Sequence, residues 1–347
     1  MRTHDKRTLT RTTLSSRREL LRALGAAGGA ALLAPLAMRG SMAYAASVGP
    51  MTGVSGTMLE LDGSYSPANS AEGGNAFAEV AAEPPQDAVL RKHLAALRYE
   101  EIVVELALSA VAPPLLSWVS AFLQNGAVPK SGALTYLDYS GKEMRRLEFL
   151  NALITEVKLP ACDAANAKDR ASLTLRLAPE STRLVGGGGK VAGTGYGKSQ
   201  MVAASMFRMN VQGLENACGR IRSVSAPSAK RPLGRAVGVE KVSKTAPGLL
   251  DCAPISIVLP EQDAGPFYLW FNDFALKGNV GAERPGRLEF LSPNLATVLA
   301  TVDFGNLGIV RYAPLPPSGE SSGKMGAMSA AYVQVDMFCE TLSLAVV

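Results

Sequence analysis

Residues 57–63 read TMLELDG, and residues 207–213 read FRMNVQG. Each stretch is a short run of alternating side chains that ends on a glycine, which predicts a strand entering a turn. The closing glycines, Gly63 and Gly213, lie 150 positions apart. This recurrence is the first indication that the chain contains two similar halves.

The same order of patterns continues outward from these two stretches. Apolar runs at residues 102–108 and 255–259 predict strands, and each precedes a segment that carries one of the two tryptophans, Trp118 and Trp270. The apolar spacing over residues 115–123 predicts a helix. We therefore expect one helix per half, with its tryptophan as a matched core anchor.

Three further pairs of strand patterns keep nearly the same separation along the chain. They are residues 134–138 with 288–292, residues 149–154 with 304–309, and residues 172–177 with 332–337. A separation that drifts only from about 150 to about 160 residues predicts a tandem duplication into paired domains. Several regularly spaced strands with one helix predict a mainly β fold, with two small barrels or sandwiches that each carry a flanking helix.

The beginning of the chain has the composition of an export signal. A basic stretch containing Arg17 and Arg18 leads into an apolar segment at residues 23–38, and Ala43 to Ala45 offer a small-residue cleavage site. Adjacent arginines in this context predict a twin-arginine signal peptide over residues 1–45. The apolar run is shorter than the roughly 20 residues that a membrane-spanning helix needs. The alternative is a basic arm that binds nucleic acid or membrane.

Removal of this segment would change the charge balance. Residues 1–45 hold eight of the 35 basic and two of the 30 acidic side chains, which leaves 27 basic and 28 acidic residues in the remainder. A net charge near −1 argues against nucleic-acid binding. We expect a protein exported to the periplasm or the cell exterior without a permanent membrane anchor. The expected domains are residues 46–184 and 205–347, joined by a glycine-rich linker at residues 185–204.

Several motifs follow one another in an informative order in the first half: LELDG at 59–63, EGGN at 72–75, LRYEEI at 97–102, LDYSGK at 137–142 and FLNA at 149–152. In this order they resemble the tail-tube protein family of contractile phages. The resemblance covers residues 57–184, and the second half shares only the outline. It implies a β-barrel with a flanking helix, similar to the tube-forming protein of type VI secretion. It also implies rings that stack into a hollow tube, with three two-domain chains per ring.

A glycine-rich segment from Ala192 to Ser199 fits a relaxed nucleotide-binding loop, with Lys198 for the phosphates. Such a loop needs a buried strand before it and a helix after it. Because a run of glycines precedes it and a predicted strand follows, a flexible interdomain linker is the favoured interpretation. A nucleotide-binding enzyme that uses this segment remains a distant alternative.

Other candidate chemistry is sparse. The four cysteines, Cys162, Cys218, Cys252 and Cys339, lack the close spacing of a zinc site, so we expect mostly buried thiols. One disulfide is possible after export, and the sequence does not identify the pair. His93 lies among cations and is expected at the surface. We predict no catalytic, cofactor-binding or metal-binding residue and no enzyme activity. The expected function is an exported structural protein that self-assembles into rings, tubes or fibres, with other tail-like or secretion-apparatus proteins as candidate partners. The alternative is a monomeric exported binding protein that retains the barrel fold.

Overall fold

The computed structural model describes five stretches of the chain, namely residues 56–82, 91–188, 202–236, 244–316 and 331–347. The predicted signal peptide and the segment from Ala192 to Ser199 lie outside these described residues.

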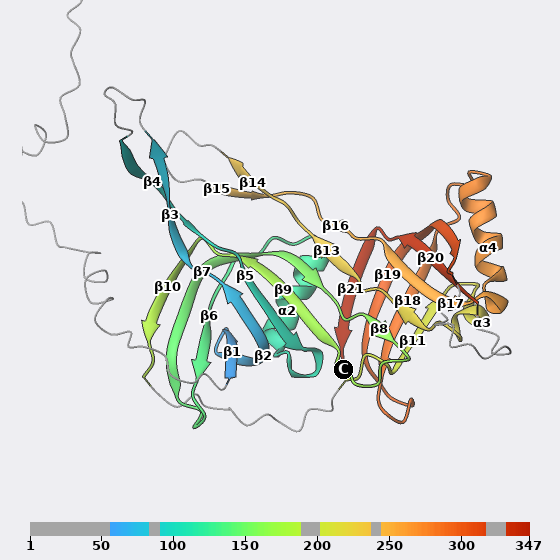
Figure 1. The fold of residues 1–347 in the computed structure, drawn as a ribbon, viewed down its shortest axis with the longest axis horizontal. Helices are drawn as coiled ribbons and strands as arrows, with labels where there is room; N and C mark the ends of the chain where they lie inside the picture. The colour runs from blue at the N-terminus through green and yellow to red at the C-terminus, as the bar shows by residue number, and fades with distance from the viewer. Residues whose placement is uncertain (1–55, 83–90, 189–201, 237–243, 317–330) are drawn as a thin grey trace, which may run out of the picture. The chain divides into compact units, whose positions relative to one another are not determined.

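The first half forms a closed barrel of antiparallel strands (Figure 1). Pairing runs in the order β7-β6-β1-β2-β5-β9, and β9 pairs again with β7 to close the barrel. An additional strand, β10 (Ser181–Gly186), pairs with β7. The barrel strands are β1 (Gly56–Leu61), β2 (Ser64–Gly73), β5 (Ile102–Ala107), β6 (Lys130–Leu137), β7 (Glu143–Lys158) and β9 (Ser172–Ala178).

Alternation of side chains explains why these segments close a barrel. On β5, Ile102, Val104 and Leu106 are fully buried. Their cross-strand partners on β9 are Leu177, Leu175 and Leu173, which are fully buried as well. Since successive side chains of a strand point to opposite faces, this period-two pattern gives each strand one apolar face for the barrel interior.

The second half forms a nearly closed barrel. Pairing runs β11-β18-β19-β20-β17-β12, and the described residues include no pairing between β12 and β11. A short helix, α3 (Glu215–Cys218), stands where the first half has β2. The strands are β11 (Phe207–Val211), β12 (Ser223–Val224), β17 (Ile255–Pro260), β18 (Arg284–Leu291), β19 (Val298–Pro314), β20 (Tyr332–Phe338) and β21 (Thr341–Val346), of which β21 pairs with β19.

The two barrels share one pairing scheme. The contacts β1–β6, β6–β7, β7–β9, β5–β9 and β7–β10 recur as β11–β18, β18–β19, β19–β20, β17–β20 and β19–β21. Gly63 and Gly213 have φ of +75° and +76° at the turns that follow β1 and β11. This left-handed backbone suits glycine, which has no Cβ. The predicted mainly β fold with two barrels is confirmed.

Each barrel carries one principal helix. These helices are α2 (Pro113–Leu123) and α4 (Gly265–Phe271), and α4 continues into a π-helical turn, η3 (Asn272–Leu276). Trp118 and Trp270 are buried, and their indole N–H groups donate to the carbonyls of Val128 and Ala282 at 2.7 and 3.0 Å. A buried indole is favourable when its N–H finds an acceptor. The prediction of matched tryptophan anchors is confirmed. Short 3-10 turns, η1 (Leu108–Ala110) and η2 (Glu261–Asp263), precede the two helices.

Short strands are exchanged between the two sheets. From the first half, β8 (Cys162–Asp163) pairs with β12. From the second half, β13 (Ser228–Lys230) pairs with β7 and with β16 (Asp251–Cys252). Most buried apolar residues of both barrels form one continuous cluster. No periodic signal marks such two- and three-residue strands, and the sequence did not predict them.

Two further strand pairs stand apart from the barrel sheets. The β3 (Ala76–Ala82)–β4 (Lys92–Tyr99) ribbon continues the β2–β5 hairpin, and the second pair is β14 (Leu233–Ala236) with β15 (Lys244–Pro247). The sequence did not predict them as strands, since alanine-rich segments such as residues 76–82 carry little β signal.

Within the stretches that the structure describes, no helix is both long enough and apolar enough to span a membrane.

Candidate assembly surfaces

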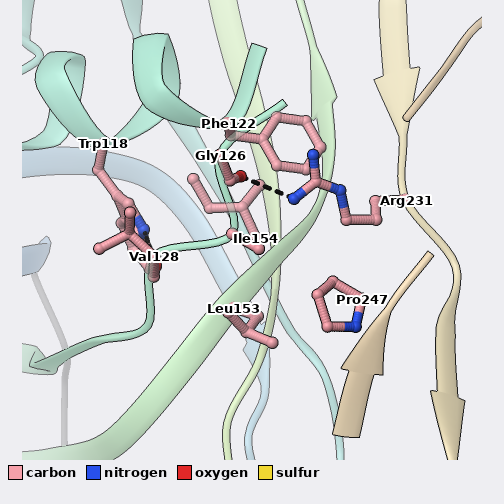
Figure 2. Close-up of a pocket in the computed structure, with 9 residues that line it drawn as sticks. Trp118, Phe122, Gly126, Val128, Leu153, Ile154, Arg231 and Pro247 are labelled. Atoms are coloured by element: carbon pink, nitrogen blue, oxygen red, sulfur yellow. Dashed lines mark hydrogen bonds between the residues drawn. The ribbon is translucent and has the colours of Figure 1, made fainter. Parts of the chain in front are cut away.

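Arg231 follows β13 and is buried at the end of helix α2, with only 3% of its surface exposed. Its guanidinium donates to the carbonyl of Gly126 and to the side-chain oxygen of Asn125, both at 2.7 Å. It also lies over the ring of Phe122, with 5.2 Å between the guanidinium carbon and the ring centroid. Figure 2 shows the hydrogen bond to Gly126 and the ring of Phe122 next to the guanidinium. Arg231 therefore connects the strand inserted from the second half with the helix of the first half.

The C-terminal end of α2 explains why the positive charge of Arg231 is stable in a buried position. Within the described part of the chain, the partners of Arg231 are a carbonyl, an amide oxygen and an aromatic ring, and none is a carboxylate. The last carbonyls of a helix carry partial negative charge, which stabilises a cation close to them. Burial lowers the pKa of the Arg231 guanidinium, but arginine stays protonated in proteins. The contact is thus charge-assisted and specific.

A small cavity of about 10 Å³ lies beside Arg231 (Figure 2). Its lining is mainly apolar and includes Trp118, Val128, Ile154 and Pro247. This volume corresponds to about one water molecule. The cavity is too small for an organic ligand, so this site is a joint within the chain rather than a binding pocket.

Helix α2 also lies against β21, a strand of the second barrel. Leu123 at the end of α2 and Leu342 on β21 line one groove of about 540 Å³, and both side chains are buried. Leu344, two residues further along β21, is 7% exposed. The helix of one barrel therefore covers the last strand of the other.

Helix α4 holds the same position in the second barrel. When the helices are matched through Trp118 and Trp270, the side chains of Leu116, Val119 and Leu123 correspond to those of Tyr268, Phe271 and Ala275. Val119 and Leu123 are buried, whereas Phe271 is half-buried and Ala275 is exposed.

Tyr268 and Phe271 of α4 are three residues apart and lie on one helix face, and Ala275 follows in the π-helical turn η3. We call this set the α4 face. Tyr268 is 45% exposed, and the rings of Tyr268 and Phe271 contact Tyr312 of β19, with centroids 5.3 and 6.5 Å apart. Among the described strands, no β21-like strand covers this face.

Strand β10 is the counterpart of β21 in the first barrel. Its Leu184 corresponds to Leu344, because both lie four residues after the glutamates Glu180 and Glu340 that open the two strands. Leu184 is only half-buried, whereas Leu344 is buried next to α2. Among the described residues, α2 therefore covers β21, whereas α4 and β10 do not pack against each other.

The β3–β4 ribbon has a second exposed apolar surface. Register pairs Ala78 with Leu97 and Val80 with Leu94, which places these four side chains on one face of the ribbon. Leu94 and Leu97 are 74% and 62% exposed. A two-stranded ribbon with an uncovered apolar face is marginal in water, so a surface of this kind marks an interaction site.

Residues considered for chemistry at the sequence level are not gathered in one place. His93 is exposed on β4, as predicted. Cys162, Cys218 and Cys339 are buried and Cys252 is half-buried, which confirms the prediction of mostly buried thiols. Among the described residues, no group of three or more His, Cys, Asp or Glu side chains is placed to hold a metal ion. Sequence patterns did not reveal Arg231 or the α4 face, because both depend on long-range packing.

No model of a known protein family matches the chain. No curated protein matches it either.

Several solved structures resemble part of the chain. One is the PVC sheath/tube terminator of an extracellular contractile injection system, with a TM-score of 0.35 and 16% identity over 40% of this chain and 98% of that chain. Another is the tube-terminating cap of the anti-feeding prophage, with a TM-score of 0.35 and 14% identity over 40% of this chain and 95% of that chain. A third is Hcp1 from Flavobacterium johnsoniae, with a TM-score of 0.25 and 18% identity over 39% of this chain and 98% of that chain.

Proposed function

We propose that this chain is an exported structural protein that self-assembles into rings, and that the rings stack into a tube or fibre. The two barrels are the products of a tandem duplication. The matched pairing schemes and matched tryptophan contacts support the duplication. The assembly itself is argued from the helix–strand joint.

One observation carries the proposal: α2 covers β21 within the chain, while the equivalent α4 face and the equivalent strand β10 lack such a partner among the described residues. If a second copy repeats the joint, its β10 packs against the α4 face of the first copy. This contact would bury Tyr268 and Ala275 and would shield Leu184, as Leu344 is shielded already.

Such a contact joins two different surfaces, so it is head-to-tail. Head-to-tail contacts extend from copy to copy and give a ring when the rotation closes. In a ring of this type, joints within chains alternate with joints between chains. Six barrels then correspond to three copies, and the second barrel supplies every intermolecular helix.

The β3–β4 ribbon provides a surface for stacking in the proposed tube. Its apolar face carries Leu94 and Leu97, whereas the helix–strand joint is formed by α2 and β21. Exposed strand edges and apolar ribbon faces recruit further chains through backbone pairing and burial of apolar surface.

We also propose that the protein is exported by the twin-arginine pathway, with residues 1–45 as its signal peptide. Fusion of residues 1–50 to a reporter that is transported only when folded tests this step. The reporter should leave the cytoplasm, and replacement of Arg17 and Arg18 by lysine should abolish transport. Equal transport with and without the arginine pair contradicts the proposed pathway.

Light scattering after size-exclusion chromatography, combined with negative-stain microscopy of the purified protein, tests the assembly. We expect particles of at least three chain masses and ring-shaped projections. Monomers and an absence of rings or fibres at all concentrations tested contradict assembly and favour the alternative, a monomeric exported binding protein.

A further inference from the structure

Two of the four cysteines lie together in the fold. Cys252 ends β16, and Cys339 lies in the turn between β20 and β21. The neighbouring strands β17 and β20 pair Ile255 with Met337. If this antiparallel register continues past the last pair, Cys252 and Cys339 fall at nearly opposite positions.

Sulfur contacts agree with this placement. The Cys252 thiol donates to the carbonyl of Glu340 at 3.8 Å, and the Cys339 thiol donates to the carbonyl of Thr341 at 3.4 Å. The side chains of Cys252 and Cys339 also interact with each other electrostatically. In contrast, Cys162 lies in β8 and Cys218 in α3, and both are buried.

The two thiols differ in a way that suits sequential chemistry. The interaction with Cys339 lowers the pKa of the Cys252 thiol, while the same interaction and burial raise the pKa of Cys339. Cys252 is half-buried and Cys339 is buried. Since the thiolate is the attacking species, Cys252 is the first nucleophile.

We propose that Cys252 and Cys339 form a disulfide when the folded chain meets a small-molecule or protein disulfide as oxidant. The Cys252 thiolate attacks one sulfur of the oxidant, forms a mixed disulfide and releases one thiolate. Cys339 then loses its proton and attacks the Cys252 sulfur, so that the protein disulfide forms and the second thiolate leaves. Overall, two protein thiols are oxidised and one disulfide is reduced to two thiols.

The proposed disulfide between Cys252 and Cys339 would cross-link two different parts of the fold. β16 pairs with β13, which pairs with β7 of the first barrel, while Cys339 belongs to the second barrel. The disulfide would therefore fasten the exchanged strands to the β20–β21 turn and close a long loop. A cross-link of this kind stabilises the fold chiefly by restricting the unfolded chain.

Oxidised glutathione is a suitable probe, applied to the reduced, folded full chain. After blocking of free thiols and digestion with trypsin without reductant, we expect the peptides spanning residues 245–277 and 325–347 to be joined, with the mass of two hydrogens lost. The count of free thiols should fall from four to two. A thermal melt of the oxidised chain should show a higher midpoint than that of the reduced chain.

Three variants sharpen the test. In Cys339→Ala, Cys252 should retain a stable glutathione adduct, and in Cys252→Ala no cross-link should form. Cys218→Ala is the matched control and should keep the cross-link. The proposal is overturned if the folded wild-type chain keeps four free thiols, if glutathione stays on Cys252 in the wild-type chain, or if a different pair becomes linked.

Discussion

Asn151 and Asn306 occupy the same bend in the two longest strands, β7 and β19, and both have a left-handed backbone, with φ of 47° and 53°. The amide of Asn151 donates to the carboxylate of Glu180 at 2.8 Å, and that of Asn306 donates to Glu340 at 2.6 Å. Each glutamate N–H in turn donates to the carbonyl of the residue before the asparagine. The two barrels therefore share this bend down to its hydrogen bonds.

Asn151→Ala tests the energetic role of this bend. Alanine removes the hydrogen bond to Glu180 and disfavours the positive φ, so we expect a loss of about 1–2 kcal/mol in the free energy of unfolding. Asn151→Gly should cost less, because glycine adopts this backbone without strain. Urea unfolding measures both, and Asn306→Ala should behave like Asn151→Ala. An alanine variant as stable as the glycine variant contradicts the role of the backbone.

Arg231→Lys tests the buried joint at the end of α2. Lysine keeps the charge but lacks the planar fork that reaches Gly126 and Asn125 together, so we expect a loss of about 2 kcal/mol in stability. The matched control is Arg208→Lys, which alters an exposed arginine that pairs with Glu289 and should cost at most about 0.5 kcal/mol. Chemical unfolding compares the two, and equal costs would show that the joint does not depend on the fork.

The pH dependence of alkylation tests the unequal thiols. Because its pKa is lowered, Cys252 holds more thiolate at a given pH, so we expect it to react with iodoacetamide at lower pH than an ordinary thiol. Burial raises the pKa of Cys162 to about 12 and that of Cys218 to about 11, so both should stay protected in the folded chain. Mass spectrometry follows each site.

Cys339→Ala provides the control for that experiment. It removes the side chain whose interaction lowers the pKa of Cys252, so the alkylation profile should move to higher pH. An unchanged profile would contradict the assigned cause. Equally fast modification of Cys162 in the folded chain would contradict the assigned burial.

The apolar periodicity of the sequence predicted the strands and helices that recur in both barrels. The short exchanged strands depend on tertiary packing and were not predicted. The strands around Gly63 and Gly213 and the helices that carry Trp118 and Trp270 lie where the sequence patterns placed them, because each buries one regular apolar face. The exchanged strands have only two or three residues and no detectable period. They form where long-range contacts such as that of Arg231 hold them in place.

The candidate assembly surfaces could not be predicted from the sequence. Nothing in the sequence around Leu123 of α2 and Ala275 of η3 indicates that β21 covers the first and no strand of the described chain covers the second. Likewise, the proximity of Cys252 and Cys339 follows from strand register across a separation that no spacing rule describes.

Charges on the β3–β4 ribbon should separate stacking from ring formation. Leu94→Glu combined with Leu97→Glu places two carboxylates on the exposed apolar face, where they would have to be desolvated on stacking. We expect single rings that no longer form longer particles, seen by negative-stain microscopy, with unfolding unchanged within about 0.5 kcal/mol. Tubes of normal length in this variant would exclude the ribbon as the stacking surface.

The α4 face provides the most direct measurement, through the particle mass of Ala275→Arg compared with that of Ser117→Arg. Ala275 is exposed, so the substitution should leave the fold intact while blocking the approach of a neighbouring β10. Ser117 is an exposed, outward position of α2 and serves as the matched control. By light scattering, we predict single chains for Ala275→Arg and wild-type particles for Ser117→Arg. Wild-type particle mass in a folded Ala275→Arg variant would contradict the proposed joint between chains.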